Sequence, residues 1–301
     1  MAQFEGEVAE CRAYVEAKKD RSEALGTTQE VWDRERCVST LSGDKWACGI
    51  HQELAGQFWP RKAVLGIASI LLKKGVTIAT HTMVKEISRG ASHQGCRFTL
   101  ATERGANILT HKLIHATNGY ASSLIPQLKG VIVPVRGQVI ATSPIQQFWI
   151  PKNLSMNDGY EYLIHRFEDK RIIYGGMRWK AQTAGKEVAV CDDSKIDCSV
   201  SESLSSPLIN LFPALKDEPD FKIDYEWTGI MGYSVDNYPL IGQVGSDDLE
   251  WIAAGYSGNG MPQCFGAAKA VSEMITGRLP TGSKWTPMFD PRRFENEEYA
   301  K

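Results

Sequence analysis

The chain has 301 residues, of which 43% are hydrophobic and 23% charged, and its formal net charge is −2. With this composition, a chain of this length can bury roughly 75% of its unfolded surface, so we expect a folded protein of one large or two modest globular domains rather than a disordered chain. The nearly balanced charge excludes the broad basic field with which proteins attract nucleic acids or anionic membrane surfaces.

Helices alternating with short strands are predicted for the first 130 residues. Apolar spacing and end signals predict helices at 6–19 and, opened by Pro60 and closed by Gly75, at 61–75. Period-two patterns predict strands in this order: two short pieces within 76–87, a hairpin of 96–101 and 106–110, and a buried strand at 112–117.

From residue 131 onward, strands dominate the pattern. They are predicted at 131–143, 160–167, 171–179, 221–234, 238–244 and 249–256. Amphipathic spacing predicts one helix at 194–212 and another that begins near Pro262. The simplest organisation is two interleaved modules, one α/β and one dominated by antiparallel strands with a covering helix.

A glycine-rich turn, GYSGNGMPQCFG at 255–266, joins the last strand to the last helix. Glycine allows positive φ and close approach of a ligand, and a helix N-terminus presents unpaired N–H groups to an anionic or carbonyl-bearing molecule. Residues 113–126, LIHATNGYASSLIP, likewise end a strand in a small polar turn. Each segment alone fits either a cofactor-facing loop or a plain turn.

Cysteines and apolar stretches bear on compartment. The seven cysteines are scattered without a CxxC pair, a pattern that predicts neither a disulfide framework nor a zinc site. The longest apolar stretch, at 63–72, is far shorter than the roughly 20 residues that span a bilayer. We therefore expect no metal, no membrane segment and a reducing, cytoplasmic location.

Five segments taken in order carry a family resemblance. They are GVTIATHTMVKEI, LIHATNGYASSLIP, VIVPVRGQVIAT, EWTGIMGYSVDNYPLIG and WIAAGYSGNGMPQCFGAAKAVSEMI. From about Gly49 to Gly277 the chain resembles the FAD-dependent amino acid and amine oxidoreductases, the D-amino acid oxidase-like group that includes sarcosine and glycine oxidases. The resemblance implies a set of flavin-facing residues: Thr117, Asn118, Gly119, Gly258, Asn259, Gly260 and Met261.

One departure from the family concerns the pyrophosphate site. Members begin with a strand, G-x-G-x-x-G and a helix, whereas this chain holds no such fingerprint, and GNGMPQ at 258–263 breaks it at Gln263. The resemblance therefore implies an α/β (α+β mixed) fold in which an incomplete Rossmann-like FAD-binding domain is interleaved with an antiparallel-sheet substrate domain. The expected boundaries are 1–130 for the partial FAD-binding domain, 131–235 for the substrate domain and 236–301 for the return to the FAD-binding domain.

The family chemistry is oxidation of the C–N bond of an amine or amino acid by hydride transfer to flavin, here with oxygen as the expected acceptor. Because the protein must mainly orient the substrate and clamp its anion, we expect Arg178, Tyr162 and Arg136 to contact it. Each arginine taken alone is more often part of a surface or structural ion pair. Gly229 stands where some relatives carry a flavin-linked cysteine, so FAD is expected to be non-covalent. Because the pyrophosphate fingerprint is missing, FAD is expected to be weakly held or absent. A truncated, cofactor-free remnant or binding module of the same fold is the alternative, and the sequence does not indicate an oligomeric state.

Overall fold

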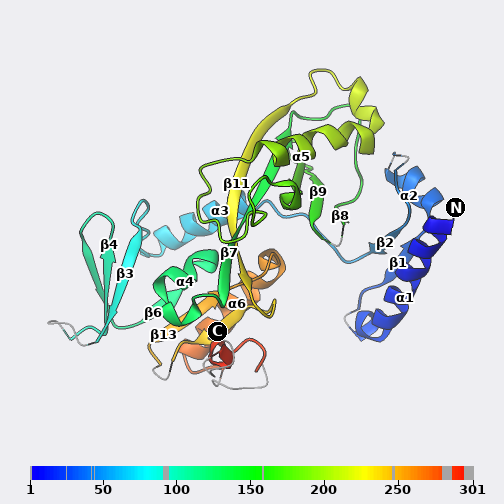
Figure 1. Ribbon diagram of the computed structural model, residues 1–301. Coiled ribbons are helices and arrows are strands. Elements are labelled where there is room, and N and C mark those ends of the chain that lie inside the picture. The colour runs from blue at the N-terminus through cyan, green and yellow to red at the C-terminus, as the bar shows by residue number, and fades with distance from the viewer. Residues whose placement is uncertain are drawn as a thin grey trace. The chain divides into compact units, whose positions relative to one another are not determined.

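The computed structural model describes residues 2–24, 26–41, 43, 45–90, 95–157, 159–245, 248–279 and 287–294. The chain forms two compact units, each assembled from separated stretches. Unit 1 comprises 1–69, 138–186 and 195–228, and unit 2 comprises 70–137, 187–194 and 229–301. The mixed helix-and-sheet class expected from the sequence is confirmed (Figure 1). The domain boundaries drawn from the sequence stay predictions.

A five-stranded sheet with the order β11-β7-β10-β9-β8 is the centre of unit 1, and strands β7 and β11 continue into unit 2. The strands are β7 (Ile132–Thr142), β8 (Leu154–Met156), β9 (Glu161–His165), β10 (Ile172–Gly176) and β11 (Ile223–Ser234). The pairs β7/β10, β9/β10 and β8/β9 are antiparallel. This is the antiparallel sheet with a covering helix that the alternating pattern predicts.

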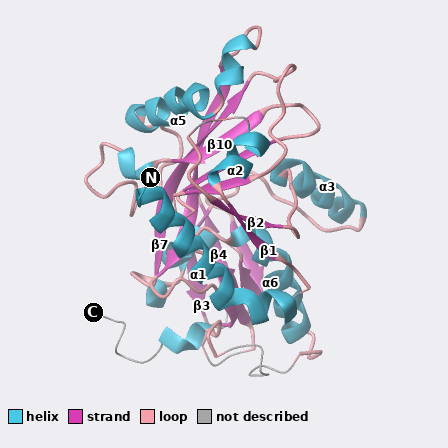
Figure 2. Ribbon diagram, turned by 90° about the vertical axis from the view of Figure 1, so that its right-hand side faces the viewer, coloured by secondary structure: helices cyan, strands magenta, loops and turns pink. Residues whose placement is uncertain are grey.

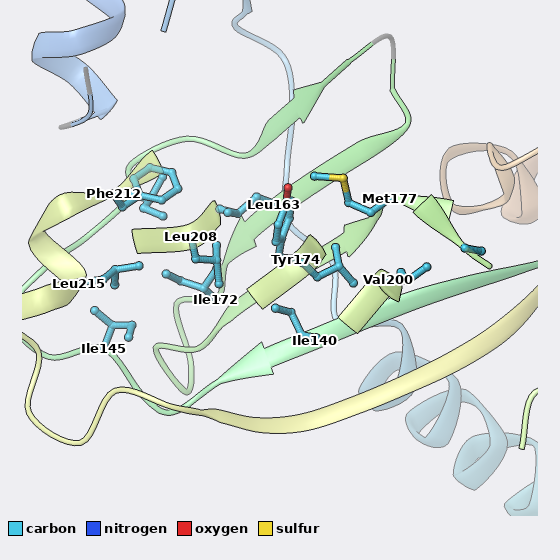
Figure 3. Packing of buried hydrophobic residues seen from close by; sticks show 13 residues of the cluster. Ile140, Ile145, Leu163, Ile172, Tyr174, Met177, Val200, Leu208, Phe212 and Leu215 are labelled. Atoms are coloured by element: carbon cyan, nitrogen blue, oxygen red, sulfur yellow. The ribbon is translucent and has the colours of Figure 1, made fainter. Parts of the chain in front are cut away.

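Helix α5 (Cys198–Leu211) covers one face of this sheet (Figure 2). Asp197 caps it, because its carboxylate accepts hydrogen bonds from the backbone N–H groups of Ser199 and Val200 at 3.0 and 3.1 Å. Its apolar residues recur at helical spacing and pack on Ile140, Leu163, Ile172 and Tyr174 of the strands (Figure 3).

The N-terminal part of unit 1 is a small assembly of two helices and a two-stranded sheet. Its elements are α1 (Ala2–Ala24), β1 (Gln29–Trp32), α2 (Arg34–Leu41) and β2 (Gly49–Gln52), with β1 and β2 antiparallel. The rings of Trp32 in β1 and His51 in β2 stack with their centroids 4.6 Å apart. Helix α3 (Pro60–Lys73) follows and begins at the proline that the sequence indicated.

Unit 2 contains two three-stranded sheets. One has the order β12-β13-β6 and the other is the meander β3-β4-β5. Their strands are β3 (Val84–Arg89), β4 (Phe98–Thr102), β5 (Asn107–Thr110), β6 (Leu113–His115), β12 (Leu240–Gln243) and β13 (Glu250–Ala254). Helix α6 (Gly260–Ile275) packs Ala267, Ala270 and Val271 into a core with Trp251, and the short α4 (Ala121–Leu124) packs in a second cluster.

A buried polar cluster connects β13 with β6 and β3. The carboxylate of Glu250, 8% exposed, accepts hydrogen bonds from Arg89 at 2.6 and 2.9 Å, and its Oε1 lies 2.8 Å from His115 Nε2. Burial alone would raise the pKa of Glu250, but the hydrogen bonds with His115 and Arg89 lower it to about 2. The charge of Glu250 is therefore compensated inside the fold.

The sequence prediction is wrong for the first strand piece in 76–87. Residues 76–80 are not in a strand, and regular pairing starts only at Val84. A single strand gains no stability without a partner, and no described strand lies beside these residues. In the same region α3 buries none of its residues, although its sequence is strongly apolar.

Within the described residues, no helix combines the length and apolar character that crossing a bilayer requires.

The Glu250 cluster predicts a pH-dependent contribution to stability. Glu250→Gln should lower the free energy of unfolding at pH 7 by about 2–3 kcal/mol, because it leaves Arg89 without its buried counter-charge. Since the folded pKa of Glu250 lies below the value of 4.5 for a free glutamate, the wild-type advantage is complete above pH 4.5 and shrinks as pH falls toward about 2. Urea denaturation between pH 3 and 7 measures this.

The control is Glu103→Gln, which removes the exposed partner of Lys85 at 3.4 Å. It should change the unfolding free energy by no more than about 0.5 kcal/mol at any pH. Equal effects of the two substitutions would contradict the role assigned to Glu250.

Candidate functional site

Parallel pairing of β6 with β13 brings the two predicted cofactor segments together. Leu113 to His115 pair in register with Glu250 to Ile252. Because the strands are parallel, the chain leaves both at the same edge, which is where ligands bind in open α/β sheets. Residues 117–119 and the loop 255–261 therefore start from one edge, although about 135 residues separate them in sequence.

The side chain of Asn118 ties these two segments to each other. Its Oδ1 accepts hydrogen bonds from the backbone N–H groups of Gly255 and Tyr256 at 3.0 and 3.4 Å. Asn118 has a positive φ of 43°, a conformation that asparagine tolerates better than most residues. That Asn118 lies beside a flavin stays a prediction; in the structure its amide oxygen holds the loop.

Close contacts require glycine at two positions next to Asn118, Gly119 in the same turn and Gly232 in β11. A Cβ at Gly119 would lie 2.6 Å from the carbonyl oxygen of Met231, and one at Gly232 would lie 2.7 Å from Asn118 Oδ1. Strand β11 thus packs against the 118–119 turn at a distance that no side chain permits. The shape of the turn is fixed by the fold around it.

The loop that follows β13 opens helix α6. Gly258 has a φ of 83°, and a Cβ there would meet the hydroxyl of Tyr233 at 3.0 Å. Asn259 is the N-cap residue but makes no side-chain cap bond, since its amide donates instead to the carbonyl of Ser257 at 3.1 Å. Gly260 and the half-exposed Met261 form the first turn. This N-terminus can therefore attract an anionic or carbonyl group.

Thr117 supplies a polar atom that the protein itself does not use. Its Oγ1 is shielded from solvent and has no hydrogen-bond partner among the described residues. A buried hydroxyl without a partner costs stability, so such a group calls for an explanation. Thr117 directly precedes the Asn118 turn, where the sequence predicts a cofactor.

On the unit 1 sheet, Tyr162 and Arg178 lie close to glycine-containing strand β10. The ring of Tyr162 crosses Gly175, where a Cβ would lie 2.6 Å from its Cζ, and burial raises the pKa of Tyr162. After β10, Met177 turns the chain with a φ of 57°, and the guanidinium carbon of Arg178 lies 5.4 Å from the centroid of the Tyr160 ring. Two of the three predicted substrate residues therefore share one unit and adjacent structural elements.

Two further aromatic residues, Tyr225 and Trp227 on β11, were missed from the sequence. They are 60% and 43% exposed and alternate with Glu226, which accepts a hydrogen bond from Ser201 of α5 at 2.5 Å. Side chains alternate across a strand, so Tyr225 and Trp227 point away from α5, as does Tyr162 next to the buried Leu163. The alternation in DYEWTG was the signal that could have found them.

Arg136, the third predicted substrate residue, is engaged inside unit 2. It is 7% exposed, its Nε donates to the carboxylate of Glu187, and its Nη1 donates to the carbonyl of Asp192 at 2.9 Å. Glu187 is itself buried, so the pair compensates two charges that the fold has removed from water. This is the structural ion pair that the sequence left open as the alternative.

No group of three His, Cys, Asp or Glu side chains is arranged for a metal ion in the part of the chain that the structure describes.

The chain is similar to a known family and to several known proteins. A family model described as FAD dependent oxidoreductase, DAO, matches residues 2–274. The chain is 25% identical over 274 residues to the probable oxidoreductase OrdL of Haemophilus influenzae, covering 87% of this chain and 58% of that protein. It is 24% identical over 274 residues to gamma-glutamylputrescine oxidoreductase of Escherichia coli, covering 88% and 59%.

The fold is similar to that of two solved enzymes. For glycine oxidase from Geobacillus kaustophilus the TM-score is 0.71 at 14% identity, over 91% of this chain and 68% of that one. For L-proline dehydrogenase from P. horikoshii it is 0.68 at 21% identity, over 95% and 82%. The chain spans a little over half the length of the curated relatives named above. It belongs to the DAO family of FAD dependent oxidoreductases, whose model matches residues 2–274.

Proposed function

We propose that this chain carries the flavin-ring end and the substrate sheet of an oxidoreductase that oxidises the C–N bond of an amine or amino acid. The observation that carries the proposal is the meeting of 117–119 with 255–261 at one edge of the parallel β6/β13 pair. Family membership supports FAD as the cofactor, and gamma-glutamylputrescine oxidoreductase and glycine oxidase, by their names, act on an amine and an amino acid.

The residues at this edge fit one end of a non-covalent FAD. Thr117 Oγ1 offers a buried hydrogen-bonding group without a protein partner, and the first turn of α6 offers backbone N–H groups. Gly258 allows the positive φ of the loop, and its Cβ position faces the Tyr233 hydroxyl. Asn118 supports the site by fixing the loop.

When bound, the flavin supplies a two-electron acceptor for the hydrogen and electron pair that leave the carbon next to nitrogen. The chain then has to bind and orient the amine. The Arg178 guanidinium is suited to a substrate carboxylate because it offers paired N–H donors in a plane. The Tyr160 ring contacts this guanidinium, and Tyr162, held across Gly175, adds a second aromatic side chain on the neighbouring strand. Oxygen is the acceptor that we assign to the reoxidation step.

A cofactor-free module of the same fold is the second candidate, and one observation favours it. Strands in parallel sheets normally have neighbours and are covered on both faces, yet β6 pairs only with β13 among the described strands. Ile114 in β6 is 52% exposed, and Phe265 on α6 is 81% exposed. These residues and the missing G-x-G-x-x-G fingerprint support weak cofactor retention.

We expect the purified 301-residue chain to lose FAD during desalting, because nothing in its sequence provides the fingerprint that binds the pyrophosphate. The absorption spectrum is recorded before and after incubation with excess FAD and gel filtration. Stoichiometric flavin that survives repeated gel filtration would contradict the prediction and make a screen for amine-dependent peroxide the next step.

Thr117→Val tests the cofactor site without relying on turnover. Removing an unpartnered hydroxyl should leave the unfolding free energy of the FAD-free chain unchanged or raise it by about 1 kcal/mol. The same change should weaken FAD binding about 5- to 10-fold, because the hydroxyl then no longer bonds the cofactor. Fluorescence titration with FAD and urea denaturation measure the two effects.

Thr142→Val is the matched control. The Thr142 hydroxyl is fully buried and satisfied, since it donates to the Ser143 carbonyl at 2.7 Å and accepts from the Ile172 N–H at 3.0 Å. This variant should lose about 1–2 kcal/mol of stability and keep its FAD affinity. An unchanged FAD affinity in Thr117→Val would remove that residue from the proposed site.

Arg178→Ala tests the anion clamp through ligand selectivity. Calorimetry with L-proline and with prolinamide, in the presence of excess FAD, should show that the variant binds the carboxylate about 10- to 100-fold more weakly while the amide changes little. Lys180→Ala removes a neighbouring cation that contacts the Trp179 ring at 4.3 Å, and it should affect neither ligand. Equal weakening of both ligands, or no carboxylate preference in the wild type, would contradict the clamp.

A further inference from the structure

Two thiols in the N-terminal part of unit 1 face each other. Cys11 lies in the middle of α1, Cys48 lies just before β2, and their sulfur atoms are 3.4 Å apart. A disulfide bond needs about 2.05 Å, so closing the pair requires the sulfurs to approach by roughly 1.4 Å. Side-chain rotation of two partly buried cysteines can supply a movement of this size.

Helix α1 contacts the two-stranded β1/β2 sheet through a narrow face. Its half-buried residues Glu7, Val8, Cys11, Val15 and Ser22 recur on one face, and none of its described side chains is fully buried. With so little apolar area removed from water, α1 depends on few interactions. Cys11 lies at the centre of this face, so a covalent bond there would be the strongest connection between α1 and the β1/β2 sheet.

A third thiol, Cys37 of α2, lies nearby but is differently placed. It is 2% exposed, its sulfur contacts the Trp32 carbonyl oxygen at 3.9 Å, and a Cβ at Gly49 would lie 3.4 Å from it. Packing against the backbone of Gly49, which follows Cys48, shields Cys37 from small oxidants. The exposed cysteines 191, 198 and 264 belong to other parts of the chain.

We propose that Cys11 and Cys48 are a modification site that a small-molecule disulfide converts into an intrachain disulfide joining α1 to β2. One protein thiolate attacks oxidised glutathione, forms a mixed disulfide and expels one glutathione thiolate. The second protein thiolate attacks the protein sulfur of that mixed disulfide and expels the second glutathione. Two protein thiols are oxidised, one glutathione disulfide is reduced, and the two protons end on the two released glutathiones.

The chemistry of Cys48 sets the conditions for the reaction. Burial, the contact with Cys11 and the nearby Glu7 and Cys37 raise the pKa of Cys48 to about 12. The thiolate is the reactive form, so the pair reacts slowly at neutral pH and faster in mildly alkaline buffer. This site requires no flavin, and its test is independent of the proposed function.

Tryptic cleavage places each of the three cysteines on its own peptide, which makes the product readable. Cys11 falls in 1–12, Cys37 in 37–45 and Cys48 in 46–61. The reduced full chain is oxidised with glutathione disulfide at pH 8.5, blocked with N-ethylmaleimide and digested without reductant. Mass spectrometry should find 1–12 linked to 46–61 as the main product, at more than five times the yield of any link to 37–45.

The same oxidation in urea supplies an internal control for the fold. Cys37 and Cys48 are 11 residues apart, whereas Cys11 and Cys48 are 37 apart. Loop-closure statistics then favour the 37–48 link about sixfold in the unfolded chain. A native preference for 11–48 that reverses in urea supports the proposal. Equal patterns in both conditions, or separate glutathionylation of Cys11 and Cys48, would overturn it.

A second chain variant separates this pair from the surface thiols. With Cys191, Cys198 and Cys264 replaced by serine, oxidation should give the same 11–48 link and raise the thermal midpoint by several degrees Celsius. Adding Cys11→Ser to that background should abolish both effects. A shift that survives Cys11→Ser would mean that other cysteines are responsible.

Discussion

The arrangement of unit 2 depends on parallel pairing between two strands of only a few residues, β6 and β13. The β6/β13 pairing spans only three residues of each strand. Two side-chain interactions reinforce it. Glu250 binds Arg89 and His115 at the start of β13, and Asn118 accepts the N–H groups that follow its end. The first compensates a buried charge and the second satisfies backbone donors, so both ends of the pair are fixed.

That fixed edge explains why a site can be defined next to an open sheet. Ile114 and Phe265 leave apolar surface exposed, and α3 buries none of its residues. These elements therefore pack against fewer residues than their apolar sequences would allow. The turn at 117–119 does not rely on them, because its contacts go to β11 and to the 255–256 backbone. The geometry of this edge is therefore independent of the exposed elements around it.

Local patterns predicted the elements well, and long-range contacts explain the rest. Pro60 and the spacing after it give the start of α3. The parallel pairing of β6 with β13, which brings the 117–119 turn and the 255–261 loop to one edge, was not predicted from the sequence. The strand expected at 76–80 failed because strand formation requires a neighbour. The partner of Arg136 is Glu187, 51 residues away, and no spacing rule reaches that distance. The role of Asn118 as a backbone tie was hidden for the same reason.

The glycines divide into two kinds, and the difference bears on where a non-protein group can come close. At Gly175, Gly119 and Gly232 the place of a side chain is taken by Tyr162, by the Met231 carbonyl and by Asn118, so protein packing alone explains them. At Gly229, within β11, a Cβ would meet no described atom within 4 Å. A glycine inside a strand weakens it without any gain in packing, and such positions are found where a ligand approaches the backbone. Gly229 follows Trp227 by two residues, so its open Cβ position lies on the same face of β11 as the exposed Trp227.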